Sequence, residues 1–134
     1  MTAVFADTFY FIALLSPQDE AHADAERFAA DEHVSLVTTA WILTELADGL
    51  AETDGRKIFH DLLHDLEMDP RVELIPPDEG LWRRAVDLYA RRSDKEWSLT
   101  DCVSFVVMAD RQITDALTGD HHFEQAGFHP LFKA

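Results

Sequence analysis

The sequence predicts a single α/β domain in which a mostly parallel sheet is covered by helices on both faces. Short apolar runs, each long enough for one buried strand, alternate along the chain with segments of helical periodicity, which is typical of parallel sheets. The 134 residues suffice for one core but not for two, and no repeat or linker divides them. We therefore expect a three-layer α/β/α domain over residues 1–134, with ligands bound beyond the carboxyl ends of the strands.

The first half of the chain is predicted to contain two strands and four helices. Residues 2–6 are an apolar run of strand length, and residues 8–15 continue as a short apolar helix that Ser16-Pro17 ends. Residues 18–32 have an amphipathic helical pattern, and residues 34–37 are a second apolar strand. Two more helices with apolar faces are predicted at residues 40–52 and 55–66. Thr38 or Thr39 can cap the third of these helices.

The second half is predicted to begin with a strand at residues 72–75, which Pro76-Pro77 closes. A helix at 78–92 can be capped by Asp78 and should turn four apolar positions inward, namely Leu81, Ala85, Leu88 and Tyr89. The helix at 98–108 is apolar almost all the way round, which predicts burial on more than one side. A strand, a short helical turn and an edge strand are expected at 115–118, 122–125 and 128–131.

Composition restricts the classes of partner. The formal net charge is −15, with 11 Lys and Arg against 26 Asp and Glu, which argues against nonspecific binding of long polyanions or acidic membranes by the whole surface. The acidic charge stays compatible with a nucleic acid that is held locally through metal ions. Asp7 interrupts the apolar N-terminal segment, so we expect neither a signal peptide nor a membrane span. The single cysteine, Cys102, lies in the apolar helix and is expected to be buried, in a cytoplasmic protein.

Four carboxylates should lie near one rim of the predicted sheet. Asp7 follows the first strand, and Asp120 follows the strand at 115–118. Asp101 lies in the first turn of the apolar helix, and Glu45 lies in the helix after the second strand. Because parallel strands end at the same edge of a sheet, we expect these side chains to converge in one acidic pocket.

Each acid also has a simpler explanation. Asp7 and Asp120 precede helical segments and can serve as N-caps, and Asp101 follows Ser98 at the spacing of a capping box. Glu45 is in mid-helix and caps nothing, but it can be a rim charge or the partner of an arginine. Taken one at a time, these residues leave the structural and the functional explanation open.

Taken together, the four acids favour a metal site. Converging carboxylates repel one another and raise their own pKa values, and a divalent cation removes that penalty. Oxygen ligands without Cys or His spacing favour Mg²⁺ or Mn²⁺ over zinc. Such a site suits hydrolysis of phosphodiester bonds. The hydroxyls of Thr8 and Ser104 are candidates for supporting the acids or metal-bound waters.

Three further groups of residues are weaker candidates. A basic patch can contact phosphate or simply be a solvated helix face, and it consists of Arg83, Arg84, Arg91 and Arg92, with Lys95 just after. His121 and His122 follow Asp120 directly, and surface or capping roles outweigh substrate binding for them. Tyr89 and Trp97 can stack on a base, although packing is the commoner use of such residues.

The motifs around the four acids resemble those of PIN-domain nucleases. In chain order they are Ala6-Asp7-Thr8, Thr44-Glu45-Leu46, Ser98-Leu99-Thr100-Asp101-Cys102-Val103-Ser104-Phe105 and Ala116-Leu117-Thr118-Gly119-Asp120-His121-His122-Phe123. The last two are the specific ones. The resemblance covers essentially the whole chain and is greatest to the VapC-type toxins of bacterial toxin–antitoxin pairs.

This resemblance implies a PIN fold and an endoribonuclease that depends on Mg²⁺ or Mn²⁺. It assigns the metal-binding positions to Asp7, Glu45, Asp101 and Asp120, and supporting positions to Thr8 and Ser104. It further implies a homodimer and a cognate antitoxin whose C-terminal segment covers the site. A basic antitoxin segment would suit the acidic charge of this chain.

Other functions stay open at this stage. A solitary PIN protein can process RNA without an antitoxin, and a PIN-like scaffold can bind RNA or a partner without cutting. Two phosphotransfer patterns fit poorly, because a haloacid-dehalogenase-like site needs a second aspartate where Phe9 stands. A receiver domain needs a paired acid before the first strand and a lysine after the fifth, and neither is visible.

Overall fold

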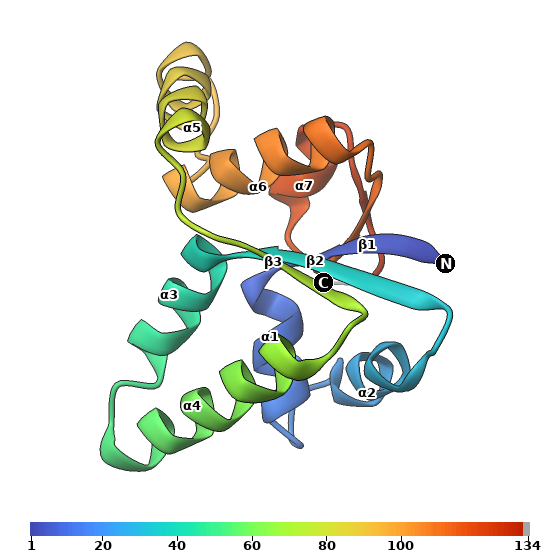
Figure 1. The fold of residues 1–134 in the computed structure, drawn as a ribbon. Helices are drawn as coiled ribbons and strands as arrows, with labels where there is room; N and C mark the ends of the chain where they lie inside the picture. Colours follow the sequence, from blue (N-terminus) through green and yellow to red (C-terminus); the bar gives the residue numbers. More distant parts are fainter. Residues whose placement is uncertain (133–134) are drawn as a thin grey trace.

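The computed structural model describes residues 1–132 and shows a five-stranded sheet between two layers of helices (Figure 1). The strands are β1 (Thr2–Ala6), β2 (Val34–Thr39), β3 (Val72–Ile75), β4 (Asp115–Leu117) and β5 (His129–Pro130). They run in the order β3-β2-β1-β4-β5, and every neighbouring pair is parallel. This confirms the parallel sheet that the sequence predicts.

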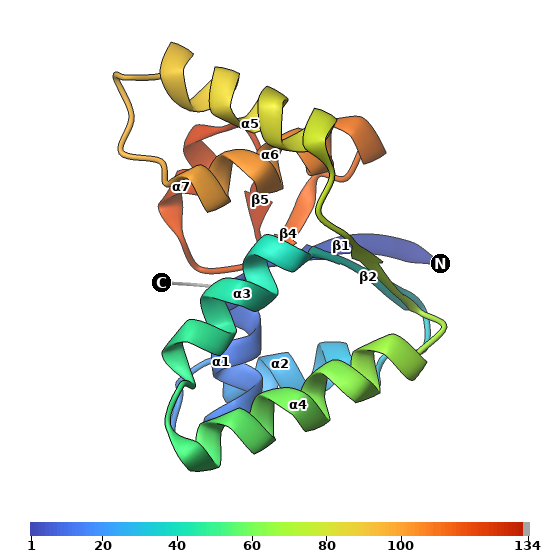
Figure 2. The ribbon, with the colours of Figure 1, turned by 60° about the vertical axis from the view of Figure 1, so that its left-hand side comes forward.

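The helices divide between the two faces of the sheet (Figures 1 and 2). One face carries α1 (Thr8–Leu15), α2 (His22–Ala30), α3 (Ala40–Gly49) and α4 (Thr53–Met68). The other carries α5 (Glu79–Arg91), α6 (Leu99–Arg111) and α7 (His121–Gln125). The three-layer α/β/α architecture is thereby confirmed. No helix within residues 1–132 is long and apolar enough to cross a membrane.

The chain adds strands first on one side of β1 and then on the other, so the topology reverses between β1 and β4. From β1 the chain adds β2 and then β3 on one side, and it returns to place β4 and β5 on the other. Phe5 pairs with Ala116 and Ala6 with Leu117, so β1 and β4 end side by side. In open parallel sheets, the crevice at such a reversal is where ligands bind. Asp7 follows β1, and Thr118 follows β4, at this crevice.

Several element bounds differ from the prediction for local reasons. The helix expected from residue 18 begins only at His22, because Asp19 accepts a hydrogen bond from the backbone of Ala21 and holds a turn there. The strand expected at 34–37 continues to Thr39, whose hydroxyl accepts from the backbone of Ile42 and caps α3. The edge strand expected at 128–131 is limited to two residues, and Pro130 has no N–H to extend it.

Helix α6 is the most deeply buried element of the molecule. Every residue from Asp101 to Met108 is buried, which confirms the prediction that this helix packs on more than one side. It lies against α5 and also contacts α3 and α7. Burial raises the pKa of the Cys102 thiol to about 11, as expected of a packed and unreactive cysteine.

The inward position predicted for Tyr89 is wrong, because this side chain is 52% exposed. On α4, whose segment was predicted to have a buried apolar face, Ile58 is 45% exposed. On α5, only Leu81 and Ala85 are buried, whereas Trp82, Val86 and Tyr89 form an apolar stripe that is open to solvent. The apolar arc of α5 is therefore wider than the part that α6 covers.

Candidate metal site at the sheet reversal

Asp7 lies at the carboxyl end of β1 and is buried, with 7% of its surface exposed. Its Oδ2 accepts a hydrogen bond of 2.8 Å from the hydroxyl of Thr118. Although Asp7 immediately precedes α1, its side chain makes no capping hydrogen bond to that helix. Burial raises the pKa of Asp7 to about 7, against the lowering effects of the Thr118 hydroxyl and of the Thr8 backbone, and the nearby charges of Asp101 and Glu45 raise it further. The capping explanation for Asp7 therefore fails.

Glu45 approaches the same place from α3. The buried hydroxyl of Thr8, in the first turn of α1, donates a 2.6 Å hydrogen bond to Glu45 Oε1. The hydrogen bond orients one of the acids, and the supporting role of Thr8 in a metal site stays a prediction. Glu45 is itself exposed and forms no ion pair with Lys or Arg in the described chain, so the arginine explanation fails for it.

Asp101 combines a structural and an electrostatic role. It completes a capping box, because its backbone N–H donates to Ser98 Oγ at 3.0 Å and its Oδ2 accepts from the Ser98 backbone at 3.2 Å. The same Oδ2 lies 3.1 Å from His122 Nδ1. Burial raises the pKa of Asp101, while the hydrogen bonds from Ser98 and His122 lower it. Capping alone therefore accounts for only part of this environment.

Asp120 is a true helix cap. Its Oδ1 accepts a 2.9 Å hydrogen bond from the backbone of His122, at the start of α7. Its own backbone N–H donates to the Thr118 hydroxyl at 3.0 Å. Since that hydroxyl donates to Asp7, Thr118 connects the loop after β4 to the end of β1.

These contacts connect the four predicted acids around one crevice, although no three of the four have ligand atoms that all lie within 4.8 Å of one another in residues 1–132. Thr8 links its neighbour Asp7 to Glu45, and Thr118 links Asp7 to Asp120. His122 then lies between Asp120 and Asp101, with Nδ1 3.5 Å from Asp120 Oδ1. Within residues 1–132, no Lys or Arg side chain forms an ion pair with any of the four. Carboxylates that are gathered without a basic partner, one of them with a strongly raised pKa, fit a hard divalent cation such as Mg²⁺ or Mn²⁺.

Two residues of this network have roles that the sequence analysis missed. Thr118 is fully buried and links two acids through one hydroxyl. His122, judged a surface or capping residue, instead bridges two carboxylates from α6 and the β4–α7 loop. In contrast, the predicted supporting residue Ser104 donates its hydroxyl to the backbone oxygen of Thr100, so no hydrogen bond joins it to an acid.

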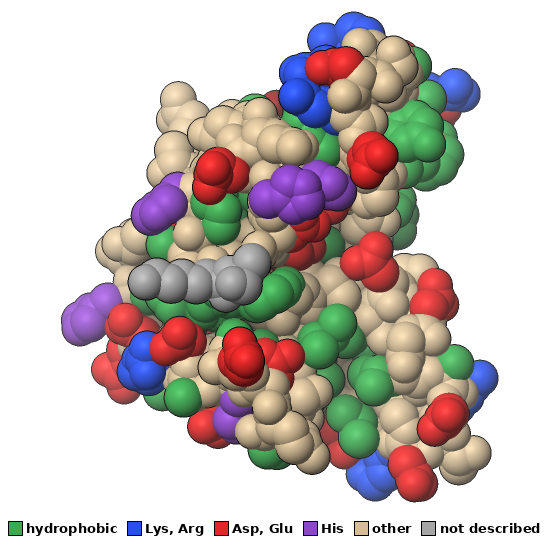
Figure 3. Space-filling view, turned by 180° about the vertical axis from the view of Figure 1, so that it is seen from behind, with side chains coloured by type: hydrophobic (Ala, Val, Ile, Leu, Met, Phe, Trp, Pro, Cys, Tyr) green, Lys and Arg blue, Asp and Glu red, His purple; other side chains and the backbone are tan. Residues whose placement is uncertain are grey.

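The basic patch on α5 is largely paired with acids. Arg84 makes two hydrogen bonds to Asp110, of 2.6 and 2.7 Å, and Arg92 makes two to Asp94. Figure 3 shows Lys and Arg side chains gathered at the end of the molecule formed by α5. Trp97 is buried beneath the Arg92 guanidinium, and its Nε1 donates a hydrogen bond to Gln125 Oε1. Its ring is therefore used for packing and is not open for stacking on a base.

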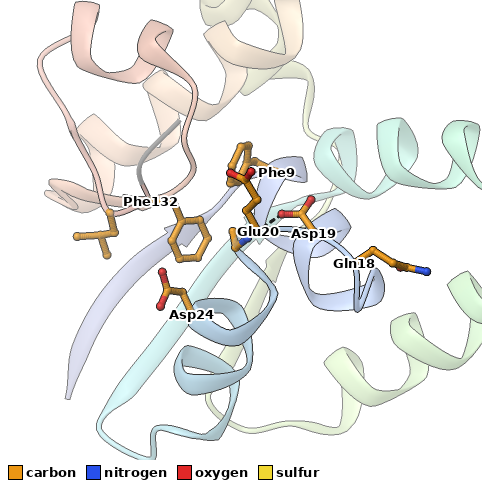
Figure 4. Close-up of a pocket in the computed structure, with 8 residues that line it drawn as sticks. Phe9, Gln18, Asp19, Glu20, Asp24 and Phe132 are labelled. Atoms are coloured by element: carbon orange, nitrogen blue, oxygen red, sulfur yellow. Dashed lines mark hydrogen bonds between the residues drawn. The ribbon is translucent and has the colours of Figure 1, made fainter.

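Two hollows lie on this part of the surface, and one of the four acids, Glu45, lines the smaller of them. One of about 420 Å³ is bounded by Trp41, Glu45 and Thr100, among others, and leads to the crevice from the α3 side. A larger one, of about 830 Å³, has Phe9 and Phe132 in its wall. Figure 4 shows the acidic side chains that line this larger hollow, namely Asp19, Glu20 and Asp24.

Comparison with known proteins places this geometry in a family. The family model for the PIN domain matches residues 4–129. A relative described as the 23S rRNA-specific endonuclease VapC20 of Mycobacterium tuberculosis is 30% identical over 126 residues, covering 93% of this chain and 95% of the relative.

Solved structures agree in fold. The crystal structure of Mycobacterium tuberculosis VapC20, described as a sarcin–ricin loop cleaving toxin, has a TM-score of 0.81 at 26% identity, covering 93% of this chain and 95% of that one. FitAcB from Neisseria gonorrhoeae has a TM-score of 0.64 at 21% identity and 96% coverage of both chains. VapBC2 from Rickettsia felis, bound to a promoter DNA fragment, has a TM-score of 0.68 at 12% identity and 98% coverage of both. The chain belongs to the PIN-domain family and is of the VapC type.

Proposed function

We propose that this protein is an endoribonuclease that hydrolyses RNA phosphodiester bonds with a divalent cation held by Asp7, Glu45, Asp101 and Asp120. The observation that carries the proposal is the gathering of four carboxylates at the sheet reversal with no Lys or Arg paired to them in residues 1–132. The chemistry of the relative described as an rRNA endonuclease supports RNA as the substrate class.

Mg²⁺ or Mn²⁺, when bound, supplies a polarised water and neutralises charge on the phosphodiester. Neighbouring residues of the chain hold and orient the four acids that would bind the cation. Thr8 and Thr118 each donate a hydrogen bond to an acid, which fixes the carboxylate directions. Because the acids would repel a bare phosphodiester, RNA binding at the site should require the cation.

We propose that the basic patch contacts the substrate outside the acids, but with fewer of its residues than the sequence analysis named. Arg84 and Arg92 are held by Asp110 and Asp94, so phosphate contact by either requires exchange of an existing ion pair. Arg83 lies 3.9 Å from Glu79, a weak exposed pair that RNA can displace. Arg91 forms no ion pair within residues 1–132. We therefore assign Arg83 and Arg91 the larger share of any phosphate binding on α5.

We also propose that the protein is the toxin of a type II toxin–antitoxin pair, acting in the cytoplasm. The acidic lining and phenylalanine wall of the 830 Å³ hollow suit a basic antitoxin segment with an apolar side chain. For the homodimer that the resemblance implies, the open stripe of Trp82, Val86 and Tyr89 is the candidate contact. A small antitoxin-like reading frame beside this one would support the pairing, and its absence would favour an antitoxin-free RNA-processing enzyme.

The test is RNA cleavage by purified wild type, Asp7→Asn and Asp101→Asn, with Mg²⁺, Mn²⁺ or excess chelator. Since even residues that only support a metal ligand typically cost 10–100-fold, we expect each change to slow cleavage by more than about 100-fold. Asp61→Asn is the matched control, because it removes an exposed carboxylate on α4 that pairs with Lys57 and belongs neither to the four acids nor to the basic patch. Ribosomal RNA is the first substrate to try, with RNA ends mapped by sequencing.

The outcomes separate the competing functions. Wild-type rates for Asp7→Asn would contradict the site, and undiminished cleavage in chelator would contradict the metal. Cation binding at the acids without cleavage of any RNA would favour the scaffold.

A further inference from the structure

The pair His121–His122 brings nitrogen ligands to the edge of the oxygen site. Nδ1 of His121 lies 3.7 Å from Asp120 Oδ1, and Nδ1 of His122 lies 3.5 Å from the same oxygen. The two imidazole rings are neighbours, with centroids 4.5 Å apart. Figure 3 shows histidine and acidic side chains directly beside one another near the middle of that face.

These distances match those between ligands of a single ion. Two atoms bound at about 2.1 Å in a tetrahedral arrangement are separated by about 3.4 Å. The nitrogen–oxygen distances of 3.5 and 3.7 Å are close to that value. One ligand atom from each of Asp120, His121 and His122 lies within 4.8 Å of the other two. The three ligand atoms are therefore close enough to one another to be candidates for binding one cation.

The donor types select a different ion from the one expected at the four acids. Imidazole nitrogen is a poor ligand for Mg²⁺ and a good one for Zn²⁺, Co²⁺ and Ni²⁺. His122 is mostly buried, with 20% of its side chain exposed, and its Nδ1 is already directed at carboxylate oxygens. His121 is 74% exposed and leaves the site open to ions from solvent.

We propose that Asp120, His121 and His122 form a site for a transition-metal dication with mixed nitrogen and oxygen ligands. This site prefers different metals from the four-acid site but shares Asp120 with it. Asp101 Oδ2, 3.1 Å from His122 Nδ1, is the nearest further oxygen. A cation bound by the histidines takes Asp120 away from the four acids. If the proposed nuclease function holds, micromolar Zn²⁺ therefore inhibits Mg²⁺-supported cleavage.

Binding is tested with Co²⁺ on untagged full-length protein, because Co²⁺ reports nitrogen ligands through its visible absorption. All variants carry His60→Asn and His64→Asn, which removes the exposed pair at i and i+4 on α4 as a competing site. In this background we expect His121→Asn and His122→Asn each to weaken Co²⁺ binding at least about tenfold. His121 is exposed, so its replacement tests the site without disturbing the core.

The matched control is His129→Asn. His129 Nδ1 lies 3.2 Å from Asp115 Oδ1, which is a similar histidine–carboxylate pair. Its replacement should leave Co²⁺ binding unchanged, and so should Glu45→Gln, which alters only the four-acid site.

The results separate this proposal from the proposed nuclease function. Unchanged Co²⁺ affinity in both His121→Asn and His122→Asn would overturn the mixed site, whether or not RNA is cleaved. Loss of the Co²⁺ spectrum in Glu45→Gln would also overturn it, because the ion would then lie among the four acids. Co²⁺ binding that depends on the histidines supports the site even if no RNA is cleaved.

Discussion

Asp7 and Asp120 each lie after a parallel strand and immediately before a helix, yet the fold uses the two carboxylates differently. Asp120 caps α7 through the backbone of His122 and stays partly exposed. Asp7 caps nothing, is buried, and has its pKa raised to about 7 by that burial. An acid that satisfies a helix end has a structural reason to be present. A buried acid that satisfies none is a cost to the metal-free fold, and so points to a ligand.

The largest difference between the two acids is expected in the free energy of unfolding of the Asp7→Asn variant, measured without metal. Below about pH 4, Asp7 is protonated in both the folded and the unfolded chain, so it does not affect stability. As the pH rises from about 4 to 7, the unfolded chain releases the proton first and the folded state loses stability. Above pH 7, Asp7→Asn should raise the free energy of unfolding by up to about 4 kcal/mol.

Urea unfolding in chelator at pH 4 and pH 8 measures this difference. The gain should be present at pH 8 and nearly absent at pH 4, and Mg²⁺ should stabilise the wild type more than the variant. An Asp7→Asn protein that is less stable than wild type at both pH values would remove the contrast with Asp120.

A smaller effect is expected at Thr118, which joins the two acids. Thr118→Val keeps the shape of the buried side chain but removes the donor to Asp7 and the acceptor for the Asp120 backbone. We expect metal-dependent cleavage to fall about 10–100-fold, as for other residues that orient metal ligands. Thr118→Ser retains the hydroxyl and should recover most of the rate, so equal losses in both variants would assign Thr118 a packing role only.

The smallest effect sharpens the role of Asp120 itself. Asp120→Ala removes the α7 cap and should cost about 1 kcal/mol in thermal or urea unfolding. Asp120→Asn keeps a good cap and should be nearly neutral for stability, while removing the charge proposed to bind metal. Cleavage lost in Asp120→Asn with stability unchanged would separate the two roles. Cleavage retained in that variant would leave Asp120 a cap and nothing more.

The sequence predicted the strands and the helices because these follow from apolar periodicity, and it predicted that Asp7 and Asp120 follow neighbouring strands because parallel strands end at one edge. It did not predict the roles of Thr118 and His122. Both roles depend on how far the end of β4 lies from β1 and α6, which is a property of the assembled sheet. For Tyr89, helical periodicity marked an apolar face correctly, but it cannot say how much of that face a neighbouring helix covers.

The hydrogen bond from Thr118 to Asp7 joins residues 111 positions apart, and it bears on how the protein is made. A ribosome completes β1, β2, β3 and the helices between them while β4 and Asp120 are still unsynthesised. A chain that stops before β4 has at most three of the four acids and lacks the strand that places the last one beside β1. Assembly of the acidic site is therefore postponed until nearly the whole chain has been translated. The nascent protein carries only part of its proposed cation site for most of its synthesis.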